Sequence, residues 1–290
     1  MGRTAFSEIV GDDAAGGAGY TGILKNIPGY ALASSKYWGM TFNTADTMTR
    51  ISTDNATPAN GTFLQTRIGA GANVGTITSK LPNLIRFDTA TSTATQGTAF
   101  LYGHTTARII TPFEVFDKDA THPYPSENFF ETYFRIGGGG GRTWDEHSWY
   151  LGFSAPAPTL PNLSTVGALV DATNLVVFHN DVGVNAVDTL SLKVAGSAGG
   201  IVTVGSVTAD STMDGKLVHA GIRVTGSNKI SFWWNGVLAA KTVLATALTA
   251  TRITFGFAIV CEATQVSMFE FQNLTMGGTL DPSSRNRTPQ

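Results

Sequence analysis

The sequence predicts an all-β protein, an antiparallel jelly-roll-type β-sandwich with an extended N-terminal arm. First, short runs that alternate large and polar residues recur roughly every 10 to 15 residues, with glycine, asparagine or proline between them. Second, glycine (33 residues) and threonine (40 residues) are abundant while only 14% of the residues are charged, a composition that favours strands and turns. Third, few segments repeat an apolar face at helical spacing, so helices should be short and scarce.

The first 81 residues are expected to form the arm. Two stretches, 11–19 and 52–62, are rich in glycine or small polar residues, which is typical of flexible loops. Aromatic islands at 37–42 and 63–68 should form short strands that anchor the arm. A small β subdomain that packs on the main domain is the alternative interpretation of this segment.

Strand-forming runs are dense from residue 84 onward, and the sandwich is expected to span 82–278. Asn235-Gly236 is the strongest hairpin signal, because both residues tolerate the positive φ angles of a tight turn. It should join strands 229–234 and 237–243. The other expected strands are 108–115, 131–136, 149–153, 175–178, 190–194, 201–207, 217–224, 253–260 and 266–272. A polar, unpatterned tail follows at 279–290.

The last third of the chain resembles the concanavalin A-like, or laminin-G-like, β-sandwich family. It contains a strand at 216–224, a turn, and an aromatic strand at 229–234 that leads into Asn235-Gly236. A long closing strand at 266–274 then alternates apolar residues with acidic or amide residues. The resemblance implies a concanavalin-like sandwich over the whole of 84–278.

Taken as a whole, the chain resembles the accessory virion proteins of tailed bacteriophages that decorate or cement a capsid. The features in common are Thr/Ala/Gly-rich strands, low charge, a single cysteine (Cys261) and an N-terminus without the apolar core of a signal peptide. The resemblance implies a structural subunit on the capsid surface, assembled in the host cytoplasm, whose partners are the major capsid protein and copies of itself. A carbohydrate-binding module of a phage head or tail fibre, with a host surface glycan as its ligand, is the alternative.

Charge and hydropathy argue against two other classes of partner. The net charge is −2 and the pI about 6.2, so no basic field is present to bind nucleic acid. No run approaches the ~18 to 20 consecutive apolar residues of a transmembrane helix, so we expect no membrane partner. No cofactor motif occurs, and no cofactor is expected.

Five aromatic residues are the candidates for an interface or a glycan site, namely Trp38, Phe63, Trp144, Trp233 and Trp234. Trp233 and Trp234 are neighbours on an expected strand, so one ring should face the core and the other should face outward. The outward ring could bind a sugar or anchor an interface. Coverage of that ring by the arm is the alternative.

We expect no catalytic residue and no enzymatic activity. Glu131, Asp145 and Glu146 are the best acids for a glycosidase, a class that includes sandwich glucanases. However, the Glu-x-Asp-x-(x)-Glu pattern of those enzymes is absent, and Asp145 and Glu146 would point to opposite faces of a strand. The Gly-x-Ser-x-Gly motif of serine hydrolases is also absent.

No metal site is expected either. His179-Asn180-Asp181 and Asp171 could bind calcium or a sugar, but the acids of the chain are scattered, and a polar loop is the favoured interpretation. The five glycines of 137–141 lack the lysine and the following helix of a phosphate-binding loop. We interpret them as a hairpin tip or a contact loop.

Overall fold

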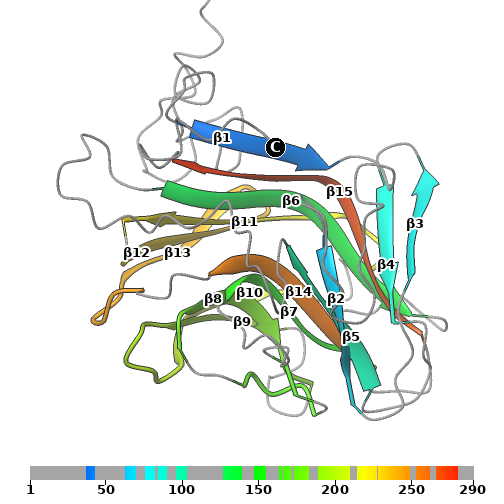
Figure 1. Cartoon of the computed structure of the whole chain (residues 1–290), viewed down its shortest axis with the longest axis horizontal. Helices are drawn as coiled ribbons and strands as arrows, with labels where there is room; N and C mark the ends of the chain where they lie inside the picture. Colours follow the sequence, from blue (N-terminus) through cyan, green and yellow to red (C-terminus); the bar gives the residue numbers. More distant parts are fainter. Residues whose placement is uncertain are drawn as a thin grey trace, which may run out of the picture.

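The computed structural model shows two antiparallel β-sheets that lie face to face (Figure 1). It describes residues 37–42, 63–69, 76–81, 84–89, 96–102, 127–138, 147–154, 163–164, 166–170, 173–182, 189–209, 214–226, 228–248, 253–261 and 266–279. Within these ranges the chain contains fifteen strands and no helix. The expected all-β, antiparallel sandwich is therefore confirmed.

The eight-stranded sheet has the long strands β6 and β15 at its centre. Its hydrogen-bonded order is β13, β12, β11, β6, β15, β4 and β3, and β1 also pairs with β15. The bounds are β1 (Tyr37–Phe42), β3 (Thr76–Leu81), β4 (Leu84–Asp88), β6 (Glu127–Gly138), β11 (Val218–Thr225), β12 (Lys229–Trp234), β13 (Val237–Val243) and β15 (Ser267–Thr279). The first half of β15 pairs with β4 and the second half pairs with β1.

The seven-stranded sheet forms the second layer. Its order is β10, β9, β8, β7, β14, β5 and β2, and each neighbouring pair is antiparallel. The bounds are β2 (Phe63–Ile68), β5 (Gln96–Tyr102), β7 (His147–Ser154), β8 (Leu175–Asn180), β9 (Thr189–Ala195), β10 (Val202–Thr208) and β14 (Thr254–Cys261). The edge strands β10 and β13 of the two sheets lie close together along one side of the sandwich.

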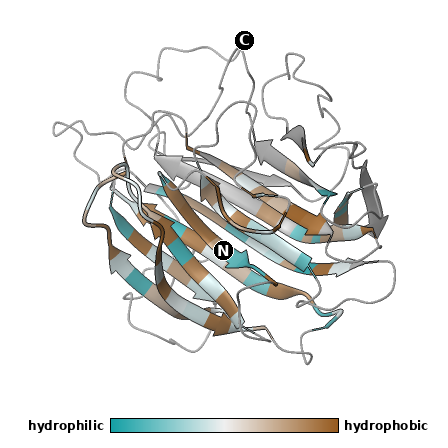
Figure 2. Cartoon of the chain, turned by 90° about the horizontal axis from the view of Figure 1, so that it is seen from below, coloured by the Kyte–Doolittle hydropathy of each residue, from teal (hydrophilic) through white to brown (hydrophobic). Residues whose placement is uncertain are grey.

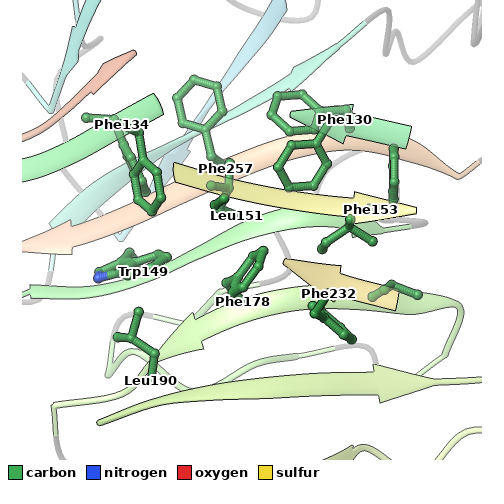
Figure 3. Packing of buried hydrophobic residues seen from close by; sticks show 14 of the residues in the cluster. Phe130, Phe134, Trp149, Leu151, Phe153, Phe178, Leu190, Phe232 and Phe257 are labelled. Carbon is green, nitrogen blue, oxygen red and sulfur yellow. The ribbon is translucent and has the colours of Figure 1, made fainter. Parts of the chain in front are cut away.

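Aromatic rings dominate the core between the sheets (Figure 3). Phe130 of β6 meets Phe153 of β7 edge-on, with ring centroids 5.5 Å apart, and Phe134 meets Trp149 in the same way at 5.6 Å. Alternate residues of strands such as β6, β7 and β8 enter this core, and Figure 2 shows the alternation as bands of opposite hydropathy along the strands. Burial of these rings stabilises the sandwich by about 25 cal/mol per Å² of apolar surface.

A second, smaller apolar cluster lies on the opposite face of the seven-stranded sheet. Tyr150 and Val177 alternate with core residues along β7 and β8, and Leu163 packs against this outer cluster. Leu163 also forms an isolated bridge with Leu169. The outer face of the seven-stranded sheet is therefore partly apolar and covered by chain.

The predicted hairpin at Asn235-Gly236 is confirmed. Strands β12 and β13 have the predicted bounds and pair antiparallel. Asn235 and Gly236 adopt φ angles of 49° and 76°, the left-handed conformation that a two-residue hairpin turn of this type requires. A register shift occurs between Phe232 and Trp233, where two residues of one strand face one of the other.

The segment expected to be an arm contributes three strands to the sheets. The strands expected at 37–42 and 63–68 are present as β1 and β2. β1 pairs with the second half of β15, and β2 is the edge strand of the seven-stranded sheet. β3 forms a hairpin with β4 across the expected domain boundary. Ile68 at the end of β2 is buried in the outer apolar cluster. The division into an arm at 1–81 and a sandwich from residue 82 stays a prediction, as does the tail at 279–290, of which only Thr279 is described.

Candidate functional site

The five predicted site residues do not converge in the described part of the chain. Trp38 lies on β1 opposite Gly278, and Phe63 lies on β2 opposite Tyr102, in different sheets. Trp144 lies outside the described residues. A role for these residues in an interface or a glycan site stays a prediction.

Trp233 and Trp234 alternate as predicted, but no ring is open to solvent. Trp234 joins the aromatic core, and its Nε1 donates a hydrogen bond to the carbonyl oxygen of Thr208 at 3.2 Å. Trp233 lies on the other face of the sheet, opposite Gly221, and is only 5% exposed. The sequence left both an exposed and a covered outward ring open, because alternation fixes the face of a residue and not whether that face is covered, and the structure has the covered ring.

Glu131 is the described member of the three candidate acids, since Asp145 and Glu146 lie outside the described residues. Its side chain lies on the outer face of the eight-stranded sheet and is almost fully buried. Its Oε1 lies 2.6 Å from Nε2 of His219, a residue 88 positions away in the sequence. The sheet register brings the two together, since β6 and β11 are neighbours.

His219 connects this acid to the hairpin turn. The backbone N–H of Gly236 donates a hydrogen bond to Nδ1 of His219 at 3.1 Å, so Nδ1 is an acceptor and Nε2 carries the proton that faces Glu131. The backbone N–H of Asn235 donates to the carbonyl oxygen of His219 at 2.9 Å, and the backbone N–H of His219 donates to Oδ1 of Asn235 at 3.4 Å. Both ring nitrogens are thus engaged within the protein, and the contacts hold the turn against the sheet.

Tyr133 is the exposed aromatic residue of this region. It is 41% exposed, and its ring lies 5.1 Å from that of His219. In the sheet register it stands between His219 of β11 and the half-buried Gln272 of β15. We call Glu131, Tyr133, His219, Asn235 and Gln272 the outer-face site. Among the described residues, no hydrogen-bond partner is present for the Tyr133 hydroxyl or the Gln272 amide.

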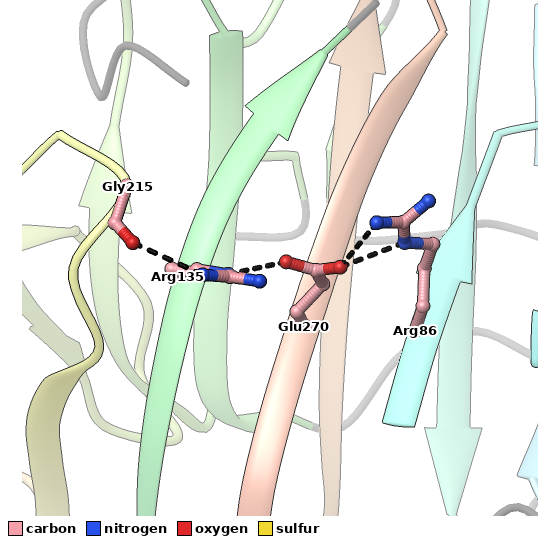
Figure 4. Close-up of polar contacts among 4 residues, drawn as sticks. All are labelled: Arg86, Arg135, Gly215 and Glu270. Carbon is pink, nitrogen blue, oxygen red and sulfur yellow. Dashed lines mark hydrogen bonds and ion pairs between the residues drawn. The ribbon is translucent and has the colours of Figure 1, made fainter. Parts of the chain in front are cut away.

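The next row of the same face is an ion cluster (Figure 4). Arg86, Glu270 and Arg135 lie opposite one another on β4, β15 and β6. Nε and Nη2 of Arg86 donate to Oε1 of Glu270 at 2.8 and 2.5 Å, and Nε of Arg135 donates to Oε2. Nη1 of Arg135 also donates to the carbonyl oxygen of Gly215 at 3.0 Å. We call these three side chains the arginine row.

Glu270 carries the strongest electrostatic perturbation of this face. The side chain is 1% exposed, and burial alone would raise its pKa. The hydrogen bonds and charges of Arg135 and Arg86 outweigh burial and hold the pKa of Glu270 below its ordinary value. The carboxylate is therefore ionised at neutral pH and shared by two guanidinium groups.

The loop considered for calcium or a sugar is used for internal contacts. Nε2 of His179 lies 2.9 Å from the carbonyl oxygen of Gly167, and burial lowers the pKa of His179 to about 4. Nδ2 of Asn180 donates to the carbonyl oxygen of His147 at 2.8 Å. Asp171 lies outside the described residues. In the described part of the chain, no three His, Cys, Asp or Glu side chains are grouped as a metal site requires.

A serine–histidine contact that sequence reasoning did not identify joins the two sheets. Oγ of Ser267 on β15 lies 2.9 Å from Nδ1 of His147 on β7. A nucleophile and base need this distance, but both residues are fully buried. A substrate could not reach this hydroxyl, and the contact acts as a polar link between the layers.

Two other sequence features lie at strand ends. Gly137 and Gly138, the first two residues of the glycine run, extend β6 and pair with Met268 and Ser267, while residues 139–141 lie outside the described part. Cys261 is the last residue of β14.

None of the described residues belongs to a helix that is long and apolar enough to cross a membrane.

Comparison with known proteins shows the fold. No protein-family model matches the chain, and neither does any curated protein. Among solved structures, the winged bean acidic lectin in complex with methyl-α-D-galactose matches with a TM-score of 0.51 and 10% identity, over 85% of this chain and 100% of the lectin. The peanut lectin with a nine-residue peptide matches with a TM-score of 0.49 and 14% identity, over 85% and 99%.

A more distant match covers part of a larger protein. The binding domain of botulinum neurotoxin DC matches with a TM-score of 0.41 and 8% identity over 73% of this chain, and the match spans 42% of that domain's length. The chain therefore has a lectin-like β-sandwich fold, as its resemblance to the concanavalin A-like family implied. At these identities the likeness concerns the fold alone.

Proposed function

We propose that the chain is a non-catalytic carbohydrate-binding domain and that the outer-face site contacts the sugar. The observation that carries this proposal is an exposed aromatic ring, Tyr133, which lies next to Gln272 in the sheet register and is separated from the exposed Asn235 by His219. An exposed aromatic residue beside an amide side chain favours glycan binding over a capsid contact.

The chemistry of these side chains suits a pyranose. An aromatic ring offers an apolar surface to the C–H face of a sugar and, in tyrosine, a hydroxyl at its edge. An amide both donates and accepts hydrogen bonds, as a sugar hydroxyl does. His219 orients the turn that carries Asn235 through its bonds to Gly236 and Glu131. The winged bean lectin, which has the same fold, is described in complex with a galactoside.

The absence of catalysis is supported by how the candidate groups are used. Nδ1 of His219 accepts the Gly236 N–H and Nε2 faces Glu131, so neither nitrogen is left to take a proton from a bound substrate. Ser267 and His147 are closed to solvent. These contacts favour a binding role for the described acids and histidines.

A glycan array screened with the full chain tests this proposal. The array should contain neutral, uronic-acid, sialylated and sulfated glycans, and the affinities of hits should be measured by calorimetry. Tyr133→Ala should weaken binding by roughly tenfold or more, because the stacking surface is lost. Tyr133→Phe, which retains the ring, should stay within a fewfold of the native affinity. Binding of no glycan, or unchanged binding by Tyr133→Ala, would contradict the proposal.

A structural role in a virion remains the second candidate, and one observation favours it. Val202 of β10 and Val237 and Val243 of β13 are 56%, 56% and 63% exposed, and both strands are sheet edges. Exposed edge strands with apolar residues are surfaces where another chain can pair or pack. In this reading the edge contacts capsid proteins or further copies of the chain, and the protein sits on the capsid surface. The two roles are compatible, since a head or tail fibre domain could bind glycan through the outer-face site.

A further inference from the structure

We propose that the outer-face site selects an acidic sugar, whose negative group binds Arg135 while its ring stacks on Tyr133 and Arg86 supplies the excess positive charge. This inference rests on the proposed carbohydrate-binding function and specifies the ligand class. It follows from the position and the charge of the arginine row.

The arginine row lies directly beside Tyr133. Tyr133 and Arg135 are two residues apart on β6 and so share a face, about 7 Å from each other along the strand. On β15 the corresponding residues are Gln272 and Glu270, and Arg86 lies opposite Glu270. A sugar that stacks on Tyr133 can therefore extend a substituent to Arg135, while Arg86 lies beyond Glu270 and adds positive charge to the row.

The charge of the row is not balanced within it. Two guanidinium groups share the single carboxylate of Glu270, which leaves one net positive charge. A neutral ion pair would need only one arginine, so the second guanidinium group is free to attract a further anion. Asp214 and Lys216 flank Gly215 in the chain, so this turn adds no net charge nearby. Asp88 lies one row further along β4, on the side away from Tyr133.

Both arginines are positioned and have unused donors. Their side chains are 22% and 17% exposed, so solvent reaches the row. Glu270 holds Arg86 through Nε and Nη2, and among the described residues Nη1 of Arg86 has no hydrogen-bond partner. Arg135 is held by Glu270 and Gly215, and its Nη2 is likewise without a partner in that part of the chain. Fixed guanidinium groups with spare N–H donors match the oxygens of a carboxylate or sulfate group.

The test uses the full chain and the acidic glycans of the array. The affinity of each carboxylated hit is compared with that of its methyl ester, which retains the sugar ring and loses the charge. The acid should bind roughly tenfold tighter or more, and the difference should shrink as NaCl rises from about 0.05 to about 0.5 M. A separate arm with sulfated galactan oligosaccharides distinguishes sulfate from carboxylate as the preferred group.

Variants assign the preference to the arginine row. Arg86→Gln leaves the Glu270–Arg135 pair intact and removes the net charge of the row, so it should reduce the affinity for the acid toward that for the ester. Lys229→Gln removes the same charge from an exposed position on β12 and should have little effect. Equal affinities for acid and ester, or an acid preference that survives Arg86→Gln, would overturn this inference while glycan binding stands. Only a failure to bind any glycan would overturn the proposed function itself.

Discussion

Glu270 shows how a buried carboxylate can stay charged in a sheet. The two strands that flank β15, namely β4 and β6, each place an arginine directly opposite Glu270. These residues, Arg86 and Arg135, are 184 and 135 positions away from Glu270 in the sequence. Burial would raise the pKa of the carboxyl group, but the two guanidinium groups hold it below its ordinary value. The charged form is therefore favoured by folding, which makes the stability of the protein depend on pH.

The sign of this dependence follows from linkage. Because the folded-state pKa of Glu270 is lower than the ordinary value of 4.5, its contribution to stability is complete above that value. The contribution is lost as pH falls from about 4.5 through the folded-state pKa. We expect urea denaturation midpoints of the native chain to fall over this range, and Glu270→Gln, which does not titrate, to show a shallower fall.

At pH 7, Glu270→Gln should lower the free energy of unfolding by about 3 kcal/mol, since Arg86 and Arg135 then lack their shared anion. Asp88→Asn, one row away on β4, serves as the control and should keep the acid-dependent loss because Glu270 is intact. If Glu270→Gln and the native chain lose stability in parallel below about pH 4.5, the guanidinium groups do not hold the carboxylate as described.

Residue-scale features were the least predictable from the sequence. The outer-face site joins Tyr133, His219 and Gln272, which lie on three strands far apart in the chain, and only the sheet register places them side by side. Glu131 was singled out as an acid, but its partner His219 could not be named without that register. The Trp233–Trp234 pair shows the opposite case. Alternation predicted the two faces correctly, while coverage depends on the whole fold.

At the scale of elements, strong local signals were sufficient for some strands and absent for others. β12 and β13 match their predicted bounds because a tight turn with positive φ angles has a distinct sequence. β5 was not predicted, since its first residues are small and give little alternation. Gly97 of β5 lies between β14 and β2, and a Cβ atom there would lie 2.1 Å from the carbonyl oxygen of Ile259. Close strand packing thus removes the side chains that would have signalled the strand.

This packing leads to a prediction about two glycines. Gly97→Ala should destabilise the protein by about 3 kcal/mol or more, because backbone atoms of Ile259 and Val260 must move to admit the methyl group. Gly226→Ala is the control. Gly226 has a φ of +59° and open space around its Cβ position, so it should cost only about 1 kcal/mol of backbone strain. Thermal denaturation measures both, and equal losses would mean that β5 and β14 are less closely packed.

At the scale of the whole molecule, the two sheets draw on both ends of the sequence. Residues before 82 contribute the outer strand β2 to one sheet, and β1 and β3 to the other. The pairing of β1 with β15 connects residues 232 to 242 positions apart, and the pairing of β2 with β5 connects residues 29 to 39 positions apart. Composition suggested an arm because glycine-rich stretches separate the aromatic islands, and the islands alone could not reveal their partners. The all-β sandwich class itself was predictable from the alternation and the turn residues found throughout the chain.

Deletion of residues 1–81 tests whether this segment belongs to the fold. From composition, the shortened chain should melt near the temperature of the full chain and lose only its attachment to partners. The strand pairing favours the opposite result, since the deletion strips three strands, exposes the edges of β4 and β5 and removes buried Ile68. We therefore expect a fall in melting temperature of roughly 10 °C or more, or no folding. A deletion of residues 1–36 is the control, because every strand in the described part of the chain begins at or after Tyr37. A chain without residues 1–81 that melts cooperatively within a few degrees of the full chain would show that the sandwich is complete without them.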